Sequence, residues 1–260
     1  MKNRQTKSLF IYWLSAILAV YLSSCGGSSE KQSGSGKSRE IEPEIAQGPV
    51  ALEGDEEVLE FYAAKPDFFR VKTIEDLPDD LNWADGSDQA EFASPEAKQG
   101  GTLKLFTGDW PRTLRFVGPD ANGAFRRYIL DNNAYGLVGT HPEGDGYIPG
   151  LAKEWAMGKD GKTVYFRLDP DARYSDGKRV RVTDFFFLFY FMQSKHLQAP
   201  WYNDYYSEEK FENVTLYDTR TLSITFYKAK PDVIEKVSLR PVPQHFYKFL
   251  DQDYLKEYQW

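Results

Sequence analysis

Apolar and polar residues alternate most regularly over residues 211–228, FENVTLYDTRTLSITFYK. The apolar positions recur at every second residue on both sides of the polar stretch YDTR: Val214, Leu216, Leu222, Ile224 and Phe226. A period of two is typical of strands with one buried face. The pattern therefore predicts a β-hairpin that turns at YDTR. KTVYFRL at residues 162–168, entered through the turn KDGK, is predicted as a further strand.

An unbroken apolar block, TDFFFLFYFMQ, occupies residues 183–193. It is too short to span a bilayer and longer than most strands. We therefore expect a buried helix, with Thr183 as its N-cap. A second helix is expected over residues 230–237, KPDVIEKV, with Pro231 in its first turn.

Weaker patterns lie nearer the N-terminus. EEVLEFYAAKPDFF predicts a short helix that ends before Pro66, and GGTLKLF at 100–106 alternates in the manner of a strand. Residues 122–139 carry apolar side chains at near-helical spacing as far as Gly136, which predicts a helix. The acidic, turn-rich residues 49–99 are interpreted as an extension that lies on the domain or stays loose, and the domain itself is expected over 100–260.

The first 24 residues have the order of a secretory signal. Lys2, Arg4 and Lys7 precede an uncharged run over residues 9–22, and small residues follow it. A bilayer-spanning helix needs about 20 apolar residues, so this run is short for a permanent anchor. Residues 25–48 are rich in Ser, Gly, Lys and Glu, which is typical of a flexible tether.

Cys25 is the only cysteine of the chain and ends this signal. The stretch LSSC at 22–25 resembles the lipobox of bacterial lipoprotein signals. That resemblance implies a diacylglycerol on the Cys25 thiol, cleavage before it, and acyl chains such as palmitate that hold the protein at a membrane. The alternative is a cysteine that is discarded with the signal peptide. No base lies nearby in sequence, which argues against a catalytic thiol.

Charge and composition exclude some classes of partner. Without residues 1–24, which carry Lys2, Arg4, Lys7 and no acid, the chain keeps 29 basic and 39 acidic residues, a net charge of −10. So acidic a chain is a poor match for nucleic acid. With no cysteine pair, the fold depends on a hydrophobic core. The abundant aromatics (17 Tyr, 18 Phe and 6 Trp) suit both a core and a binding cleft.

Six stretches together resemble the family 5 extracellular solute-binding proteins, which are the peptide-binding and related receptors of ABC importers. They are GGTLKLF, PRTLRF, YIPGLAKEW, KDGKTVYFRLDPDARYSDG, TDFFFLFYF and RPVPQHFY. The resemblance implies an α/β fold of the periplasmic-binding type, a peptide or other small solute as ligand, ABC permease subunits as partners, and a place in the cell envelope outside the cytoplasm. It implies neither catalysis nor a cofactor. Gly177 in SDG is expected to adopt a positive φ.

The chain also departs from the family. Asp171 stands where the family commonly has Gly, and Arg181 where Thr or Ser often caps the next helix. Family members have two lobes and are longer, so the resemblance implies the first-lobe portion only. We expect a fragment of a longer reading frame; a natural remnant is the alternative.

The resemblance places the loop TGDWPRTLRF at the mouth of the ligand cleft. Trp110 is then expected to stack on a ligand, Arg112 to pair with a carboxylate, and Thr113 to lie beside them. The alternative is that Trp110 packs under the loop and Arg112 is a solvated surface residue. WYNDYYSEEKF at 201–211 is interpreted as a loop that covers the core, with a ligand site as the alternative.

Other functions are weighed against binding. His141, His196 and His245 are far apart and lack metal-ligand spacing, so we expect no metal site. The chain has no G-x-S-x-G elbow and no nucleophile beside a base, which argues against a hydrolase. The second hypothesis is a surface lipoprotein without a transport role, an interaction module that reuses part of a binding fold. A permease gene next to the gene of this chain would favour the importer over the interaction module.

Overall fold

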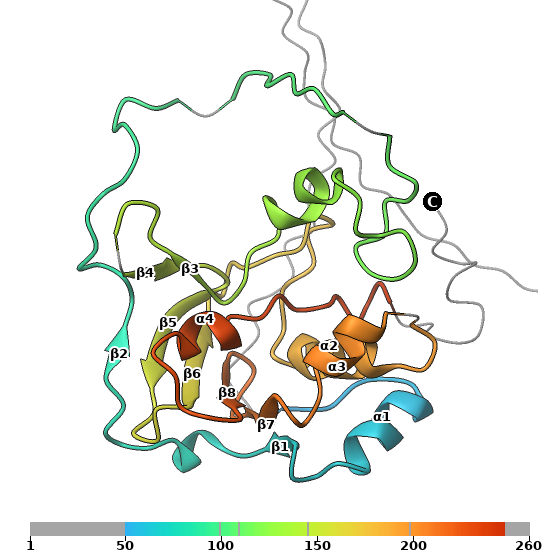
Figure 1. Cartoon of the computed structure of the whole chain (residues 1–260). Coiled ribbons are helices and arrows are strands. Elements are labelled where there is room, and N and C mark those ends of the chain that lie inside the picture. The colour runs from blue at the N-terminus through green and yellow to red at the C-terminus, as the bar shows by residue number, and fades with distance from the viewer. Residues whose placement is uncertain (1–49, 99, 109, 145, 198, 248–260) are drawn as a thin grey trace, which may run out of the picture. The chain divides into compact units, whose positions relative to one another are not determined.

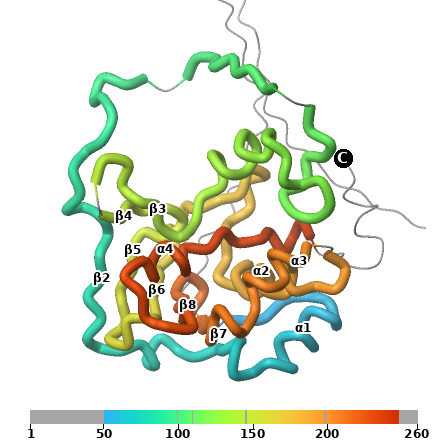
Figure 2. Tube along the Cα trace, in the orientation of Figure 1, coloured from blue at the N-terminus to red at the C-terminus, as the bar shows by residue number. Residues whose placement is uncertain are grey.

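The computed structural model describes residues 50–247 except 99, 109, 145 and 198, all within one compact unit (Figures 1 and 2). Cys25, the signal at 1–24, the tether at 25–48 and residues 248–260 lie outside the described residues. In chain order the helices and strands are α1 (Glu56–Ala63), β1 (Phe69–Val71), η1 (Ile74–Asp76), β2 (Trp83–Ala84), η2 (Arg127–Asp131), β3 (Val138–Thr140), β4 (Tyr147–Pro149), β5 (Ala152–Met157), β6 (Thr163–Leu168), α2 (Thr183–Gln193), α3 (Pro200–Tyr205), β7 (Phe211–Leu216), β8 (Thr221–Phe226) and α4 (Val233–Val237).

The main sheet has six strands in the order β1-β7-β8-β6-β5-β2. β1 pairs with β7 in parallel, and all other pairs are antiparallel. β3 and β4 form a separate antiparallel pair. The mixture of strands and helices confirms the α/β class. Among the described residues no helix is long and apolar enough to cross a membrane.

The predicted hairpin is confirmed as β7 and β8, with Val214 opposite Ile224 and Leu216 opposite Leu222. The turn is closed by the Asp218 carboxylate, which accepts the N–H groups of Arg220 and Thr221. The predicted strand at 162–168 is confirmed as β6, which pairs with β8. The alternation places the apolar side chains of these strands on one face of the sheet and Thr, Ser and Asn side chains on the other.

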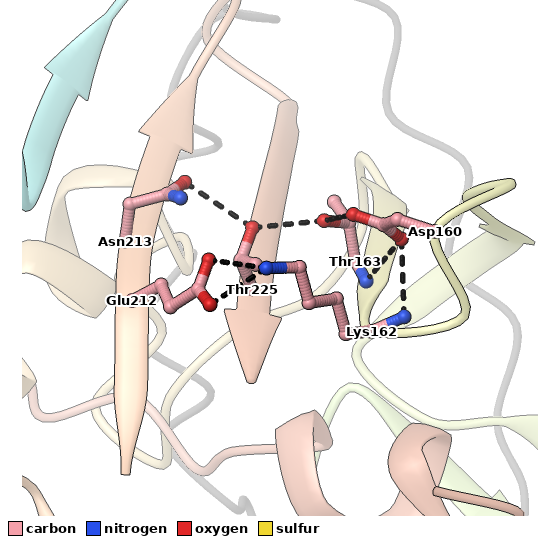
Figure 3. Close-up of polar contacts among 6 residues, drawn as sticks. All are labelled: Asp160, Lys162, Thr163, Glu212, Asn213 and Thr225. Atoms are coloured by element: carbon pink, nitrogen blue, oxygen red, sulfur yellow. Dashed lines mark hydrogen bonds and ion pairs between the residues drawn. The ribbon is translucent and has the colours of Figure 1, made fainter. Parts of the chain in front are cut away.

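A polar network joins β6, β7 and β8 near one end of the sheet (Figure 3). The Asp160 carboxylate accepts the N–H groups of Lys162 and Thr163 at 3.0 and 2.9 Å, and the Thr163 hydroxyl donates to it at 2.6 Å. Thr163 and Thr225 share a hydrogen bond of 3.0 Å, and Thr225 donates to the Asn213 side chain. Lys162 Nζ meets both oxygens of Glu212 at 2.6 and 2.7 Å. These contacts fix the turn KDGK against its neighbouring strands.

The predicted buried helix is confirmed as α2, in which every residue from Thr183 to Met192 is buried. Partners surround it on all sides, so no polar face is needed. Phe186 meets Tyr62 of α1 with ring centroids 5.4 Å apart, and Phe189 meets Phe211 of β7 at 5.1 Å. Phe191 meets Tyr247 of the C-terminal segment at 5.0 Å.

The N-cap prediction for α2 is wrong. Thr183 is the first residue of the helix, and the cap position is Val182, whose side chain makes no capping bond. The Asp184 carboxylate instead accepts the N–H of Arg181 at 2.9 Å. Pro231 likewise lies two residues before α4 rather than in its first turn, with Asp232 at the cap. Gly177 has φ +90°, as expected.

Residues 49–99 were expected to form an extension that lies on the domain or stays loose, and their described part, residues 50–98, packs on the domain and joins its sheet. The helix that was predicted to end before Pro66 is confirmed as α1, with Asp55 accepting the Val58 N–H at its cap. The segment then supplies both edge strands of the main sheet, because β1 pairs with β7 and β2 pairs with β5. Its aromatic residues enter the core through Phe69, which lies 5.0 Å from Phe186 between ring centroids.

Two further predictions are wrong. Residues 100–106 form no strand: Leu103 and Phe106 are 81% and 89% exposed, and the segment is drawn as coil in Figure 1. An alternating pattern makes a strand only where another strand accepts its hydrogen bonds, and no described strand lies beside it. Of the helix expected over 122–139, only the five-residue π-helix η2 forms, and the range already includes the start of β3.

Candidate functional site

A cavity of about 440 Å³ opens between α2, α3, η2 and the segment that follows α4. We call it the arginine–tyrosine cavity, after the side chains that dominate its wall. Its size falls within the range of small-molecule sites. Met192 of α2 and Tyr202 of α3 line one part, Ile129 and Leu130 of η2 another, and residues 173–175 and 240–247 contribute two further walls.

Three arginines line the cavity, Arg126, Arg173 and Arg240, and none of the described residues that line it is an acid. Asp131 lies behind them and joins two of the three. Its carboxylate is 3.4 Å from Arg126 Nε and 3.5 Å from Arg240 Nη1, and its carbonyl oxygen accepts from Arg240 Nη2 at 3.3 Å. One carboxylate beside two guanidinium groups leaves a positive excess, which favours an anionic group on the ligand.

Tyrosine rings supply much of the remaining wall. Arg126 donates to the Tyr202 hydroxyl, and its guanidinium lies 5.6 Å from the centre of that ring. Burial raises the pKa of Tyr206, and burial followed by the charge of Asp184 raises the pKa of Tyr174. Both phenols therefore stay neutral, and the wall combines apolar faces with fixed cations. Such a surface suits a ligand that is apolar along its length and carries a carboxylate.

The π-helix η2 lies at the edge of this cavity. Its residue Asp131 holds Arg126 from one side and Arg240, 109 residues later, from the other. π-helical turns are rare and frequently mark functional sites because they change where side chains point. Here the wider turn lets Ile129 and Leu130 line the cavity while Asp131 reaches both arginines.

The loop residues predicted from the sequence lie elsewhere. Trp110 and Arg112 line a separate hollow of about 400 Å³, and Trp110 is 86% exposed. Arg112 pairs with Asp120 at 3.2 Å, and the Thr113 hydroxyl accepts from the Arg115 backbone and side chain. A third hollow shares residues 122–124 with this one, and shares Arg126 and Tyr202 with the arginine–tyrosine cavity. The predicted loop and the cavity thus lie at opposite ends of a series of hollows.

Residues 201–211 cover part of the core, as expected, and also line part of the cavity. Tyr205 and Tyr206 pack against the core, while Tyr202 and Tyr206 also line the cavity. The segment begins as helix α3 rather than as a loop, with Pro200 at its first position.

The three histidines lie apart in the structure. His141 Nε2 is 2.8 Å from the Ala90 carbonyl, His196 faces Glu57, and His245 faces Asp176. Within the described part of the chain, no group of three or more His, Cys, Asp or Glu side chains is placed to hold a metal ion.

The cavity arginines are the residues that the sequence did not reveal as a site. Arg173 and Arg240 belong to two of the stretches that carry the family resemblance, and Arg126 belongs to a predicted helix. Their shared feature is a basic side chain next to aromatic or proline residues, as in AFRRY, DARY and LRPVP. That composition alone is common, and only the fold brings the three together.

Comparison with known proteins supports the resemblance. Residues 146–259 match the family described as bacterial extracellular solute-binding proteins, family 5 Middle. The chain is 26% identical over 117 residues to a probable ABC transporter-binding protein of Deinococcus radiodurans. Among solved structures, Haemophilus influenzae OppA in complex with RPPGFSPFR is 28% identical with a TM-score of 0.38, and NikZ of Campylobacter jejuni in complex with Ni(L-His) is 21% identical with a TM-score of 0.37.

The family match covers part of the chain. The resemblance to the family 5 solute-binding proteins is confirmed for residues 146–259, which contain β4 to α4, whereas GGTLKLF and PRTLRF lie before the matched range. The matches cover 44% of this chain and 20% of the Deinococcus protein, 43% and 25% for OppA, and 46% and 24% for NikZ. The chain thus matches about a quarter or less of each relative's length.

Proposed function

We propose that the chain is the solute-binding component of an ABC importer, tethered to a membrane through a lipid on Cys25, and that it binds peptides or similar small solutes. The observation that carries the proposal is the family 5 match over residues 146–259. In this role a receptor closes around its solute and presents it to the permease. No catalytic step and no cofactor enter the proposal.

The arginine–tyrosine cavity is the proposed contact surface for the solute. Arg126, Arg173 and Arg240 are placed to pair with a carboxylate, such as the C-terminus or an acidic side chain of a peptide. The tyrosine and aliphatic walls accept apolar side chains without selecting among them closely. Trp110, Arg112 and Thr113 are proposed as contacts at the far end of the adjoining hollows, where a longer ligand would reach them.

Binding is tested by titrating the purified chain with trialanine, followed by longer alanine peptides. Arg240→Gln is expected to weaken binding about tenfold or more, because a charge-assisted hydrogen bond contributes about 1.5–3 kcal/mol. With trialanine, Arg112→Gln is the matched control, since Arg112 lies outside the cavity, and a change within about twofold is expected; with longer peptides, which would reach the loop, Arg112→Gln is expected to weaken binding as well. The opposite result would move the primary site to the loop. Absence of binding by any peptide would overturn the peptide assignment.

The lipid anchor is tested by the intact mass of the detergent-extracted protein. Acyl chains on a chain that begins at Cys25 would support the tether, while a protein without acyl chains would overturn it. The alternative function, a surface lipoprotein that takes no part in transport, shares the anchor and differs in ligand binding. A lipidated chain that binds no peptide and no other small solute would favour that alternative.

A further inference from the structure

Asp184 lies in the first turn of α2 and is not one of the residues that line the arginine–tyrosine cavity. It is 3% exposed, and its carboxylate accepts three hydrogen bonds from three separate segments. The Arg181 N–H donates at 2.9 Å, the Tyr174 hydroxyl at 3.0 Å, and the Gln244 N–H at 3.2 Å. Burying a carboxylate costs desolvation free energy even when hydrogen bonds satisfy it. The segments that Asp184 holds together are therefore of interest.

Two of those donors belong to segments that form walls of the cavity. Tyr174 lines the cavity itself, in the wall formed by residues 173–175. Gln244 directly follows the lining residue Pro243 in the 240–247 segment, and with Asp184 it lines a separate hollow. The two walls are 60 or more residues apart in the chain and meet across the Asp184 carboxylate. One of them carries Arg173 and the other Arg240, so the carboxylate sets the spacing of two of the three cavity arginines.

A second tie between the same walls supports this reading. His245 Nε2 is 2.6 Å from Asp176 Oδ2, and the His245 ring lies 5.5 Å from the Tyr174 ring. The Gln244 side chain is held in turn by the Glu53 carbonyl, to which it donates at 2.6 Å. Residues 244 and 245 are thus anchored on three sides, while the neighbouring Pro243 and Tyr247 face the cavity.

We propose that Asp184 is a positioning residue for the cavity: its carboxylate clasps the 173–175 wall to the 240–247 wall and so sets the distance between Arg173 and Arg240. The consequence for binding rests on the proposed function, but the clasp itself does not. Replacing the carboxylate by an amide removes one acceptor and leaves a buried N–H without a partner, which loosens one of the two walls.

The chain contains a matched control for this experiment. Asp160 also accepts two backbone N–H groups and one hydroxyl, but all three donors lie within residues 162–163, far in sequence from either wall. Asp184→Asn and Asp160→Asn therefore make the same chemical change at carboxylates with the same kinds of donor. Only the first acts on the cavity.

The test is amide hydrogen exchange of the full chain, followed by titration with trialanine. Asp184→Asn is expected to speed exchange in the segments that contain Arg181 and Gln244 by about tenfold or more, with β7 and β8 unchanged. Asp160→Asn is expected to speed exchange only around residues 161–163. Trialanine affinity is expected to fall about tenfold in Asp184→Asn and to stay within about twofold in Asp160→Asn.

Each outcome decides the proposal. Unchanged exchange in Asp184→Asn both at residues 173–181 and at residues 240–247 overturns the clasp. Faster exchange with unchanged trialanine affinity overturns the positioning role. If the wild-type chain binds no peptide, the proposed function fails, while the exchange data still decide the clasp. Should Asp184→Asn not fold, Tyr174→Phe removes a single bond, and faster exchange confined to residues 173–180 is the expected result.

Discussion

The turn before β6 and the first turn of α2 each place an aspartate carboxylate on two backbone N–H groups and one hydroxyl. The pKa values of the two carboxyls nevertheless shift in opposite directions from the ordinary aspartate value. Burial raises the pKa of Asp184 to about 6 and outweighs its hydrogen bonds. At Asp160, partial burial works to raise the pKa, but the bonds from Thr163 and from the Lys162 N–H outweigh it and lower the pKa.

The comparison shows that donors alone do not set the free energy of an ionised group. The same kinds of donor stabilise the ionised form of a carboxyl near solvent, but they do not offset the desolvation of a buried one. It also separates two uses of a carboxylate. Asp160 closes a turn with donors two and three residues away, whereas Asp184 joins donors 10 and 60 residues away. The first shapes a local element, and the second connects distant segments.

The largest expected effect is an opposite pH dependence of stability. The folded Asp184 carboxyl keeps its proton up to about pH 6, whereas the unfolded chain releases it near the ordinary aspartate pKa of 3.8, so the folded state binds more protons between these values. The stability that Asp184 contributes is therefore present at low pH and lost as the pH rises through about 6. Relative to Asp184→Asn, the wild type is expected to lose about 2.4 kcal/mol of unfolding free energy between pH 4 and 7.

Urea denaturation across that pH range measures the difference. Tyr62, Tyr174 and His245 face Asp184 and are present in both proteins, so their direct contributions to stability largely cancel. Because the charge of His245 acts on the Asp184 carboxyl, the pair is also compared with His245→Gln in both proteins. Asp160 gives the opposite sign: its folded pKa is lowered, so its contribution is present at neutral pH and lost on acidification below about pH 4. If the contributions of the two aspartates to the unfolding free energy changed with pH in the same direction, the contrast between them would be wrong.

The same contrast explains what the sequence predicted and what it did not. The hairpin of β7 and β8, strand β6, helix α2 and the positive φ of Gly177 each follow from neighbours in sequence, and all are confirmed. The parallel pairing of β1 with β7 joins residues more than 140 positions apart, so no local sequence pattern predicts it. Residues 100–106 show the reverse error: the pattern of a strand is present, but no described strand pairs with it.

The candidate site follows the same rule. Trp110 and Arg112 were predicted as contacts because the resemblance places their loop at the ligand cleft, and they line one hollow. The arginine–tyrosine cavity draws instead on segments from Phe116 to Tyr247, and its charge balance depends on Asp131 reaching Arg240 across 109 residues. A resemblance to a family orders such segments, but only tertiary structure places their side chains on one wall.

A smaller effect is expected from the local carboxylate. Asp160→Ala removes the acceptor of two N–H groups and one hydroxyl in a turn that water reaches. Its cost should resemble the loss of a helix N-cap, about 1 kcal/mol, because solvent replaces part of what is lost. Urea denaturation at neutral pH provides the measurement, with Asp88→Ala as a control at an exposed aspartate outside the turn. A loss of about 3 kcal/mol or more would show that the turn is not the local element described here.

The smallest expected effect comes from the side chain of Lys162, whose contribution to stability can be measured apart from that of its backbone N–H. Lys162 donates its N–H to Asp160, while its ammonium group meets the half-buried Glu212 carboxylate. Lys162→Met keeps the N–H and removes the ammonium, so Asp160 should keep its role and stability should fall by about 0.2–1 kcal/mol. Salt screens such a pair, and the difference should shrink further in about 0.5 M NaCl. A larger loss that persists in salt would mean that the ion pair, rather than Asp160, fixes the turn against β7.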